Sequence, residues 1–340
     1  MKREPVDELR LDDFTCAQPC LKEFTLDDNL TAVECPPDES EISRTPVEPL
    51  GDLDTLPPEL LRMVLSKLDV YTLTGFRRVN RQALQAVETI PQYKAVITHA
   101  PTVLHAILSI EAGSWISCEN LYETLCTAEC EQCGDFAGYL YILTCSRVCF
   151  CCLSGLSDNM RYLPLLHSHA IEKFGLSSQI LHTLPSMRSI PGIYSPMERT
   201  SRGRFNLVDS ESACLASIAL HGSSSAMEQY VSQKLDQELQ DSSKRASQAT
   251  DEESELTTPR LHRSLTRYYF DEKFGNPLRF MAIVRMPWLN KGSWELEWGV
   301  YCAGCEAPYH NWSLHIPRKF TTATIKKHLR RCEYSRDRMH

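Results

Sequence analysis

The segment CEQCGDFAGYLYILTCSRVCFCC, residues 130–152, places six cysteines in 23 positions. Within it, Cys130-x2-Cys133 and Cys149-x2-Cys152 form two CxxC pairs separated by fifteen residues. A CxxC turn lets two thiolates face one ion, and four thiolates close a tetrahedron around zinc with Zn–S distances of about 2.3 Å. The spacing therefore predicts a zinc site. A site closed by four thiolates leaves no position for water, so we expect it to be structural.

Other cysteines compete for the second half of this site. Cys145-x3-Cys149 offers an alternative pair, and Cys151 lies between the two favoured ligands. Because free cysteine is often buried, we interpret Cys145 and Cys151 as core residues. Cys118 and Cys126 lie near enough in the sequence to substitute, and we give them little weight.

Bulk composition limits the classes of function. The 340 residues include 15 cysteines and carry 36 basic against 44 acidic side chains, a net charge of -8. This balance argues against a chain that binds nucleic acid along its whole length and leaves room for a local basic patch. We find no apolar run long enough to cross a membrane and no secretory signal. The expected location is intracellular, in the cytoplasm, the nucleus or both, where reduced thiols favour metal ligation over disulfides.

A second cysteine module lies near the end of the sequence. Cys302-x2-Cys305 follows an expected strand, and the expected helix TTATIKKHLRRC, residues 321–332, carries His328 and Cys332 at i and i+4. Together these four side chains predict a second structural zinc site. The basic residues of this helix are expected to form a solvated face that offsets the thiolate charge; they are Lys326, Lys327, Arg330 and Arg331.

A different closure of the second site uses His310 and His315. The resulting C-x2-C-x4-H-x4-H spacing is close to a zinc knuckle, and Tyr309 and Trp312 would then be available to stack on bases. We prefer the first closure because a knuckle would leave His328 and Cys332 without a role.

The sequence predicts an α+β fold with an uneven organisation along the chain. Hydrophobic periodicity, charge and Ser/Gln-rich composition divide it into five segments. They are a disordered acidic arm (1–50), a helical domain (51–98), a helical and zinc-binding module (99–194), a low-complexity linker (195–262) and a β-hairpin with the second zinc module (263–340).

The helical domain contains LPPELLRMVLSKLDVYTLTGFRRVNRQ, residues 56–82. Apolar residues recur at helical spacing in three successive pieces, Pro57 and Pro58 suit a helix start, and Asp69 suits an N-cap. Three short helices cannot bury enough apolar surface to be stable alone. Their apolar stripes must be completed by the rest of the chain or by a partner protein.

This segment resembles an F-box. The family pattern starts Leu-Pro-x-Glu-Leu, and the matching positions are Leu56, Pro57, Glu59, Leu60, Leu65, Leu68, Leu73, Phe76, Val79, Asn80 and Arg81. The remainder is similar to fungal F-box proteins. The shared features are an RVCxxCL segment at 147–153, an A-x-x-x-[FY]-x-L stretch at Ala170, Phe174 and Leu176, and a C-terminal CxxC…HxxxC pattern.

The resemblance implies a non-catalytic substrate receptor of a Skp–cullin–F-box ubiquitin ligase. Residues 56–90 would dock on the Skp adaptor and so reach the cullin scaffold, and the zinc-stabilised remainder would hold an unidentified target protein. The implied adaptor-binding residues are Leu56, Pro57, Leu60, Leu65, Leu68, Leu73, Phe76 and Val79. The alternative is a nucleic-acid-binding zinc protein that uses the basic C-terminal helix or the knuckle. The sequence has no phosphate loop, G-x-S-x-G, HExxH or deaminase motif that would indicate an enzyme.

Overall fold

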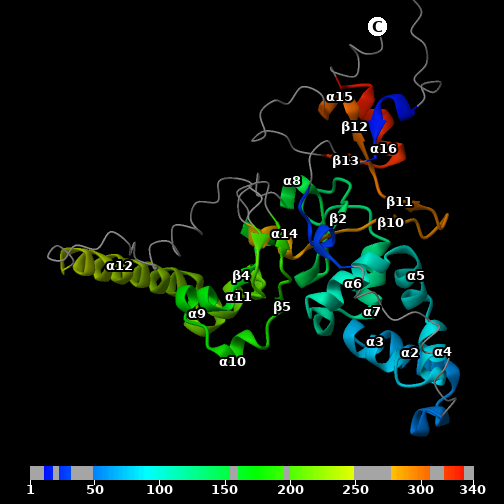
Figure 1. Cartoon of the computed structure of the whole chain (residues 1–340), viewed down its shortest axis with the longest axis horizontal. Coiled ribbons are helices and arrows are strands. Elements are labelled where there is room, and N and C mark those ends of the chain that lie inside the picture. The colour runs from blue at the N-terminus through cyan, green and yellow to red at the C-terminus, as the bar shows by residue number, and fades with distance from the viewer. Residues whose placement is uncertain are drawn as a thin grey trace, which may run out of the picture.

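A computed structural model of the chain describes residues 11–17, 23–31, 49–153, 160–194, 200–248, 277–306 and 318–332. Figure 1 shows short helices at one end, a small sheet around β2 in the middle, and a compact C-terminal module with α16 at the other end. A further group of helices, α9 to α12, lies to one side of the sheet. The α+β class predicted from the sequence is confirmed.

The first part of the chain is a run of short helices whose ends follow local sequence signals. Proline opens α2, α5 and α6, while Asp69 caps α3 and Asn80 caps α4 by accepting from backbone N–H groups at 2.8 Å. The elements are η5 (Gly51–Thr55), α2 (Pro58–Ser66), α3 (Val70–Arg77), α4 (Arg81–Glu88), α5 (Pro91–His99), α6 (Pro101–Ser109), η6 (Gly113–Trp115) and α7 (Cys118–Leu125).

One apolar core joins these helices to the first cysteine module. Leu65 of α2, Leu73 of α3 and Leu104 of α6 belong to the same buried cluster as Leu140 and Ile283 of the central sheet. The expected division between residues 98 and 99 is therefore not a boundary in the packing, because the core runs across it.

The central sheet has the antiparallel order β3-β2-β9. β2 (Tyr139–Tyr141) and β3 (Ser146–Val148) are joined through η7 (Ile142–Thr144), whereas β9 (Ile283–Arg285) comes from far along the chain and pairs with β2 in the register Leu140↔Val284. It is preceded by α14 (Pro277–Met281). Residues 283–285, which belong to the expected 263–340 module, therefore form the third strand of the central sheet.

Residues 200–248 differ most from the expectation, since they lie within the segment 195–262 that was interpreted as a linker. β8 (Asn206–Val208) is the middle strand of an antiparallel sheet with β4 (Leu165–Leu166) and β5 (Ser186–Arg188). The other elements between residues 150 and 248 are α8 (Phe150–Leu153), η8 (Met160–Tyr162), α9 (His167–Phe174), α10 (Ser178–Leu181), β6 (Gly192–Ile193), β7 (Thr200–Ser201), α11 (Ser210–His221) and α12 (Ser224–Gln248).

This segment is structured because a few of its apolar side chains are buried, although most of its residues are polar. Leu207, Val208 and Ala213 are fully buried, and Asp209 caps α11 while accepting a 2.9 Å hydrogen bond from the Tyr141 hydroxyl of the central sheet. Even α12, the longest helix described, lacks the apolar length needed to cross a membrane, as do the other described helices.

The C-terminal module begins with the expected hairpin, β10 (Trp288–Leu289) and β11 (Leu296–Glu297), turning at residues 290–295. β12 (Val300–Cys302), α15 (Ala303–Glu306), β13 (Lys319–Phe320) and α16 (Thr322–Leu329) follow. β12 is the middle strand of a sheet of order β1-β12-β13, in which β1 (Thr15–Cys16) comes from the beginning of the chain.

The described part of the expected disordered arm is therefore structured. We call residues 11–17 and 23–31 the N-terminal strap; it contains η2 (Leu11–Asp13), β1 and η3 (Leu26–Asn29). Leu26 is fully buried in the main core, and β1 pairs with β12 in the register Cys16↔Tyr301. The contacts of the strap with the rest of the chain are distant in sequence, for example 116 residues for Glu23 with Tyr139 and 285 residues for Cys16 with Tyr301, so no local sequence signal marks them.

Candidate metal centres and docking surface

The structure gathers the four cysteines of the first module around one point. The sulfurs of Cys130, Cys133, Cys149 and Cys152 all lie within 4.8 Å of one another, and Cys133 Sγ is 3.5 Å from Cys149 Sγ. A tetrahedral zinc–thiolate site requires sulfurs about 3.8 Å apart. Three of the cysteines are buried and Cys133 is exposed, so the cluster lies at the edge of the core and could hold a metal ion.

Local backbone geometry brings the pairs together. Gly134 has φ +75°, and the turn is closed by Gly134 N–H donating to Cys130 C=O at 2.9 Å and Cys130 N–H donating to Asp135 C=O at 2.7 Å. The second pair starts at the end of β3, where α8 begins, so Cys149 and Cys152 lie one helical turn apart.

Arg147 fixes the loop between these pairs from inside the core. Its guanidinium donates to the carbonyl oxygens of Met286 at 3.0 Å, Pro287 at 2.9 Å and Ala137. Burial lowers the pKa of Arg147 to about 9. This side chain connects the cysteine loop to the segment that follows β9. The RVCxxCL similarity included Arg147 but did not indicate this contact.

Without a cation, the surroundings of Cys130, Cys149 and Cys152 raise the pKa of these three thiols. The hydrogen bond to Cys149 and then burial raise the pKa of Cys130 to about 12. Burial also raises the pKa of Cys152, with the nearby Cys149 sulfur as the next cause. A divalent ion at the centre would reverse this balance, because a coordinating thiol is deprotonated.

The second module forms an equally tight cluster. Cys302, Cys305, His328 and Cys332 place their ligand atoms within 4.8 Å of one another. Cys302 and Cys332 sulfurs are 3.9 Å apart, Cys305 and Cys332 sulfurs 3.5 Å, and Cys305 Sγ is 3.3 Å from His328 Nε2. These separations fit a tetrahedral ion with three sulfur ligands and one nitrogen ligand.

Helix α16 and the turn that follows it supply two of these ligands, His328 and Cys332. A capping box at Thr321 and Thr324 starts the helix, Ile325 and Leu329 are buried beneath it, and the His328 ring stacks on Phe320 at 4.3 Å. The alternative ligands His310 and His315 lie outside the described residues. Among the described cysteines, Cys118, Cys126, Cys145 and Cys151 join neither cluster.

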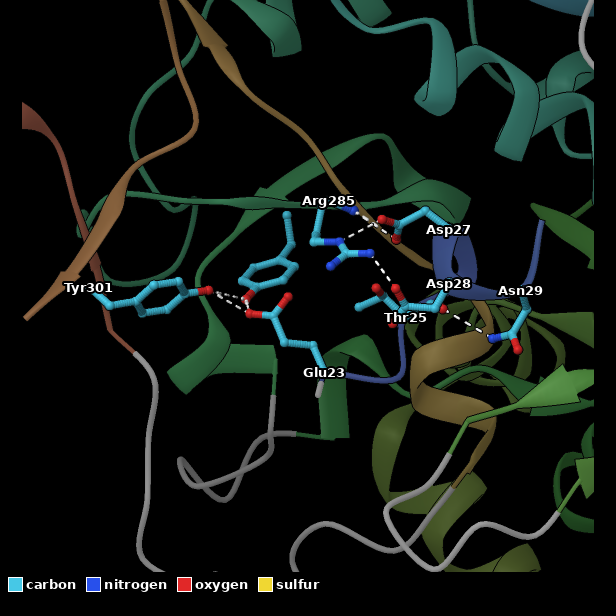
Figure 2. A network of polar contacts seen from close by, with 8 residues as sticks. Glu23, Thr25, Asp27, Asp28, Asn29, Arg285 and Tyr301 are labelled. Carbon is cyan, nitrogen blue, oxygen red and sulfur yellow. Dashed lines mark hydrogen bonds and ion pairs between the residues drawn. The ribbon is translucent and has the colours of Figure 1, made fainter. Parts of the chain in front are cut away.

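The N-terminal strap connects the two cysteine modules through a polar network that sequence reasoning missed (Figure 2). The carboxylate of Glu23, itself buried, accepts from the hydroxyls of Tyr139 on β2 and Tyr301 on β12. Asp27 and Asp28 both pair with the Arg285 guanidinium of β9. A single segment therefore contacts the central sheet and the C-terminal sheet at once.

The helices at 56–90 divide the predicted docking residues into a buried and an exposed set. Leu65 is 3% exposed and Leu73 fully buried, and Leu68 and Phe76 pack partly buried against the core, so these residues complete the chain's own interior. In contrast, large apolar side chains on the outer surface remain uncovered: Leu60 (48% exposed), Met63 (64%), Val64 (51%), Tyr71 (67%) and Val79 (65%). Leu56 is half-buried and Pro57 exposed. We call this exposed set, with Pro57, the α2–α3 apolar face.

An open groove of ≈ 810 Å³ lies between η8, β4, α9, α11 and α12. Its apolar lining includes Leu163, Leu165, Phe174, Met227 and Val231. The ion pair between Arg161 and Glu211 lies at its edge, with N–O at 2.6 Å. The groove was not foreseen, because half of its wall comes from the segment interpreted as a linker.

Comparison with protein families identifies one segment. Residues 53–94 match the F-box domain, and they contain α2, α3, α4 and the exposed apolar side chains described above. F-box domains bind the Skp adaptor in ubiquitin ligases, and proteins that carry them are generally non-catalytic. Comparison with curated proteins and with solved structures gives no significant match.

Proposed function

We propose that this chain is the substrate-receptor subunit of a Skp–cullin–F-box ubiquitin ligase. The observation that carries the proposal is the α2–α3 apolar face, which lies within the segment that matches the F-box domain. Leu60, Met63 and Val64 are spaced i, i+3 and i+4 on α2, so they share one side of that helix. Exposed apolar patches of this kind mark interaction sites. The Skp adaptor would cover this face, and the adaptor would link the chain to the cullin scaffold.

The two cysteine clusters bind structural Zn²⁺ in this proposal. Zinc fits the sulfur and imidazole donors, and a closed site with four protein ligands leaves no position for a reacting molecule. When bound, the ions stabilise the small sheets that hold the target-binding surfaces. The chain itself contributes no nucleophile: it holds a target protein near the activated ubiquitin, which raises the effective concentration of the acceptor lysine.

The buried positions decide how the adaptor interface should be tested. Leu65→Asp and Leu73→Asp would place a charge in the core and unfold the helices, so loss of binding would be uninformative. Leu60→Asp and Val64→Asp change side chains that already face solvent. Burying one such side chain at an interface contributes roughly 1.5–3 kcal/mol, so each substitution should weaken adaptor binding about tenfold or more.

The measurement is titration of the purified full chain with the purified Skp adaptor. Leu215→Asp on α11 is the matched control, because Leu215 is 60% exposed and lies outside the F-box segment. All variants should keep the wild-type melting temperature. Adaptor affinity that is unchanged in both Leu60→Asp and Val64→Asp, or absent in the wild type, would refute the proposed function.

A further inference from the structure

The C-terminal zinc module carries a concentration of positive charge that contrasts with the chain as a whole. The segment RKFTTATIKKHLRRC, residues 318–332, contains six basic and no acidic side chains, although the chain has a net charge of -8. Two of the six are engaged: Arg318 pairs with Asp135, and Lys319 lies buried with Nζ 4.8 Å from the centre of the Tyr139 ring. The remaining four are on α16 and the turn that follows it.

These four cations share the solvent side of the helix. Lys327, Arg330 and Arg331 are exposed and Lys326 is half-buried. The helical hydrogen bonds continue to Arg331, and at about 100° per residue the four positions span roughly 140° of arc. Ile325, Leu329 and Cys332 are buried on the opposite side. We call Lys326, Lys327, Arg330 and Arg331 the α16 basic face.

Nothing in the described part of the chain neutralises this face. No described side chain forms an ion pair or hydrogen bond with any of the four cations. A divalent ion bound by three thiolates and a neutral imidazole would leave about one negative charge. The C-terminal end of a helix adds about half a charge. Offsetting the metal site and the helix dipole therefore accounts for fewer than half of the four positive charges.

The backbone that carries the face is held at both ends. The capping box at Thr321 and Thr324 fixes the start of α16, and His328 and Cys332, both members of the second cluster, fix its end. The remaining exposed residues of the helix, Thr322, Ala323 and Thr324, are small. The helix backbone beneath the four cations is therefore already ordered before binding, and the face selects partners by charge rather than by an apolar anchor.

We propose that the α16 basic face binds an acidic segment of a protein partner, in which carboxylates or phosphoserines face the four cations. A protein segment suits the face better than nucleic acid. The cations cover less than two helical turns, their exposed neighbours on α16 are not aromatic, and the acidic remainder of the chain would repel a long polyanion. That this partner is the ubiquitination target rests on the proposed function; the binding itself does not.

The test is fluorescence anisotropy of the zinc-loaded full chain with a labelled dodecapeptide of alternating Glu and Ser. We expect binding that weakens as salt increases. The combined variant Lys326→Gln, Lys327→Gln, Arg330→Gln and Arg331→Gln should bind at least tenfold more weakly. The matched control removes four exposed cations outside the F-box segment, through Lys173→Gln, Arg202→Gln, Arg204→Gln and Lys234→Gln, and should bind as the wild type does.

Two further probes fix the class of ligand. A peptide of alternating Gln and Ser should not bind, and oligothymidine of the same net charge should bind more weakly than the acidic peptide. The proposal fails if the wild type does not bind the acidic peptide, if the α16 variant binds it unchanged, or if the Gln peptide binds equally. Tighter binding of oligothymidine would assign the face to nucleic acid instead.

Adaptor titration on the same preparations separates this proposal from the proposed function, because the α2–α3 apolar face is not altered in the α16 variant. Peptide binding without adaptor binding would refute the receptor role alone. Adaptor binding without peptide binding would refute only the role of the α16 basic face.

Discussion

At the residue scale, Arg147 shows how one buried side chain organises the cysteine loop. It is 3% exposed and donates to three backbone carbonyls, two of which follow β9. A lysine has one nitrogen and cannot span these acceptors as the guanidinium fork does. The neighbouring cysteines draw attention to Arg147 in the sequence. Its hydrogen-bond acceptors are backbone carbonyls, which no side-chain pattern can reveal.

The cysteine thiols lead to a prediction about pH. The folded-state pKa of Cys130 is raised from 9.0 to about 12, and that of Cys149 from 9.0 to about 11. A raised pKa stabilises the folded, metal-free chain below pH 9, and this contribution is lost as pH rises through the folded values. We therefore expect the melting temperature of the zinc-stripped chain to fall between pH 9 and pH 11.

The zinc-loaded chain is the control for that measurement, because its ligand thiols have already lost their protons. Its melting temperature should change less over the same interval. A zinc-stripped chain that becomes more stable relative to the loaded chain above pH 9 would contradict the assignment of these thiols.

At the scale of elements, the N-terminal strap is held by charge in a partly buried setting. Asp27 and Asp28 side chains are 8% and 15% exposed and share the Arg285 guanidinium. Hydrogen bonds to charged groups contribute roughly 1.5–3 kcal/mol. The double variant Asp27→Asn and Asp28→Asn should therefore lower the free energy of unfolding by about 2 kcal/mol or more, measured by urea denaturation.

Two exposed ion pairs offer a matched control for the strap. Glu119 pairs with Lys67 and Glu123 with Lys291, and all four side chains are at least 44% exposed. Surface pairs of this kind contribute about 0–1 kcal/mol, so Glu119→Gln and Glu123→Gln together should change stability little. Equal losses in the two double variants would show that the strap contacts are no stronger than surface pairs.

Elements defined by local patterns were predictable, and elements defined by distant partners were not. Asp69 was predicted as an N-cap and the hairpin at β10–β11 as a turn between strands, and both are confirmed because their signals lie within a few residues. β8 and the strap were missed. Only three residues of β8 form the strand, and its partners β4 and β5 are separate in sequence, while the acidic composition of the strap gives no sign of Arg285.

The candidate site follows the same rule. The cysteine spacing predicts which ligands share an ion, since each CxxC pair is local, and the structure brings these ligand atoms together. The docking residues were predictable only as a set. Which of them face outward depends on the elements that pack against the two helices: α3 contacts α4, α6 and η6, and α2 contacts α4, so Leu65 and Leu73 are buried while Leu60 stays in solvent.

At the scale of the whole molecule, the two cysteine clusters differ in what they support. Cys130, Cys149 and Cys152 belong to the same core as Leu65 and Leu73, whereas Cys302 and Cys332 belong to a small separate core with Phe320 and Ile325. Loss of the metal from the first cluster should therefore destabilise the helices that carry the α2–α3 apolar face, whereas loss of the metal from the second cluster should not.

This difference can be measured with paired variants. Cys130→Ser with Cys133→Ser should reduce bound zinc from two ions to one by elemental analysis, lower the melting temperature and weaken adaptor binding, because zinc contributes an apparent ~10–16 kcal/mol in small domains. Cys302→Ser with Cys305→Ser should lose one ion and keep adaptor affinity. Equal adaptor affinity in the two variants would mean that the helices fold independently of the first cluster.

The pairing of β1 with β12 and of β2 with β9 also has a consequence for synthesis on the ribosome. Residues 283–302 are synthesised long after the strap and β2, so β1, the edge of β2 and the carboxylates of Asp27 and Asp28 lack their partners until then. A message cut short before residue 277 would yield a polypeptide that can never close either sheet. Such fragments would expose unpaired sheet edges, so we expect cellular quality control to degrade them.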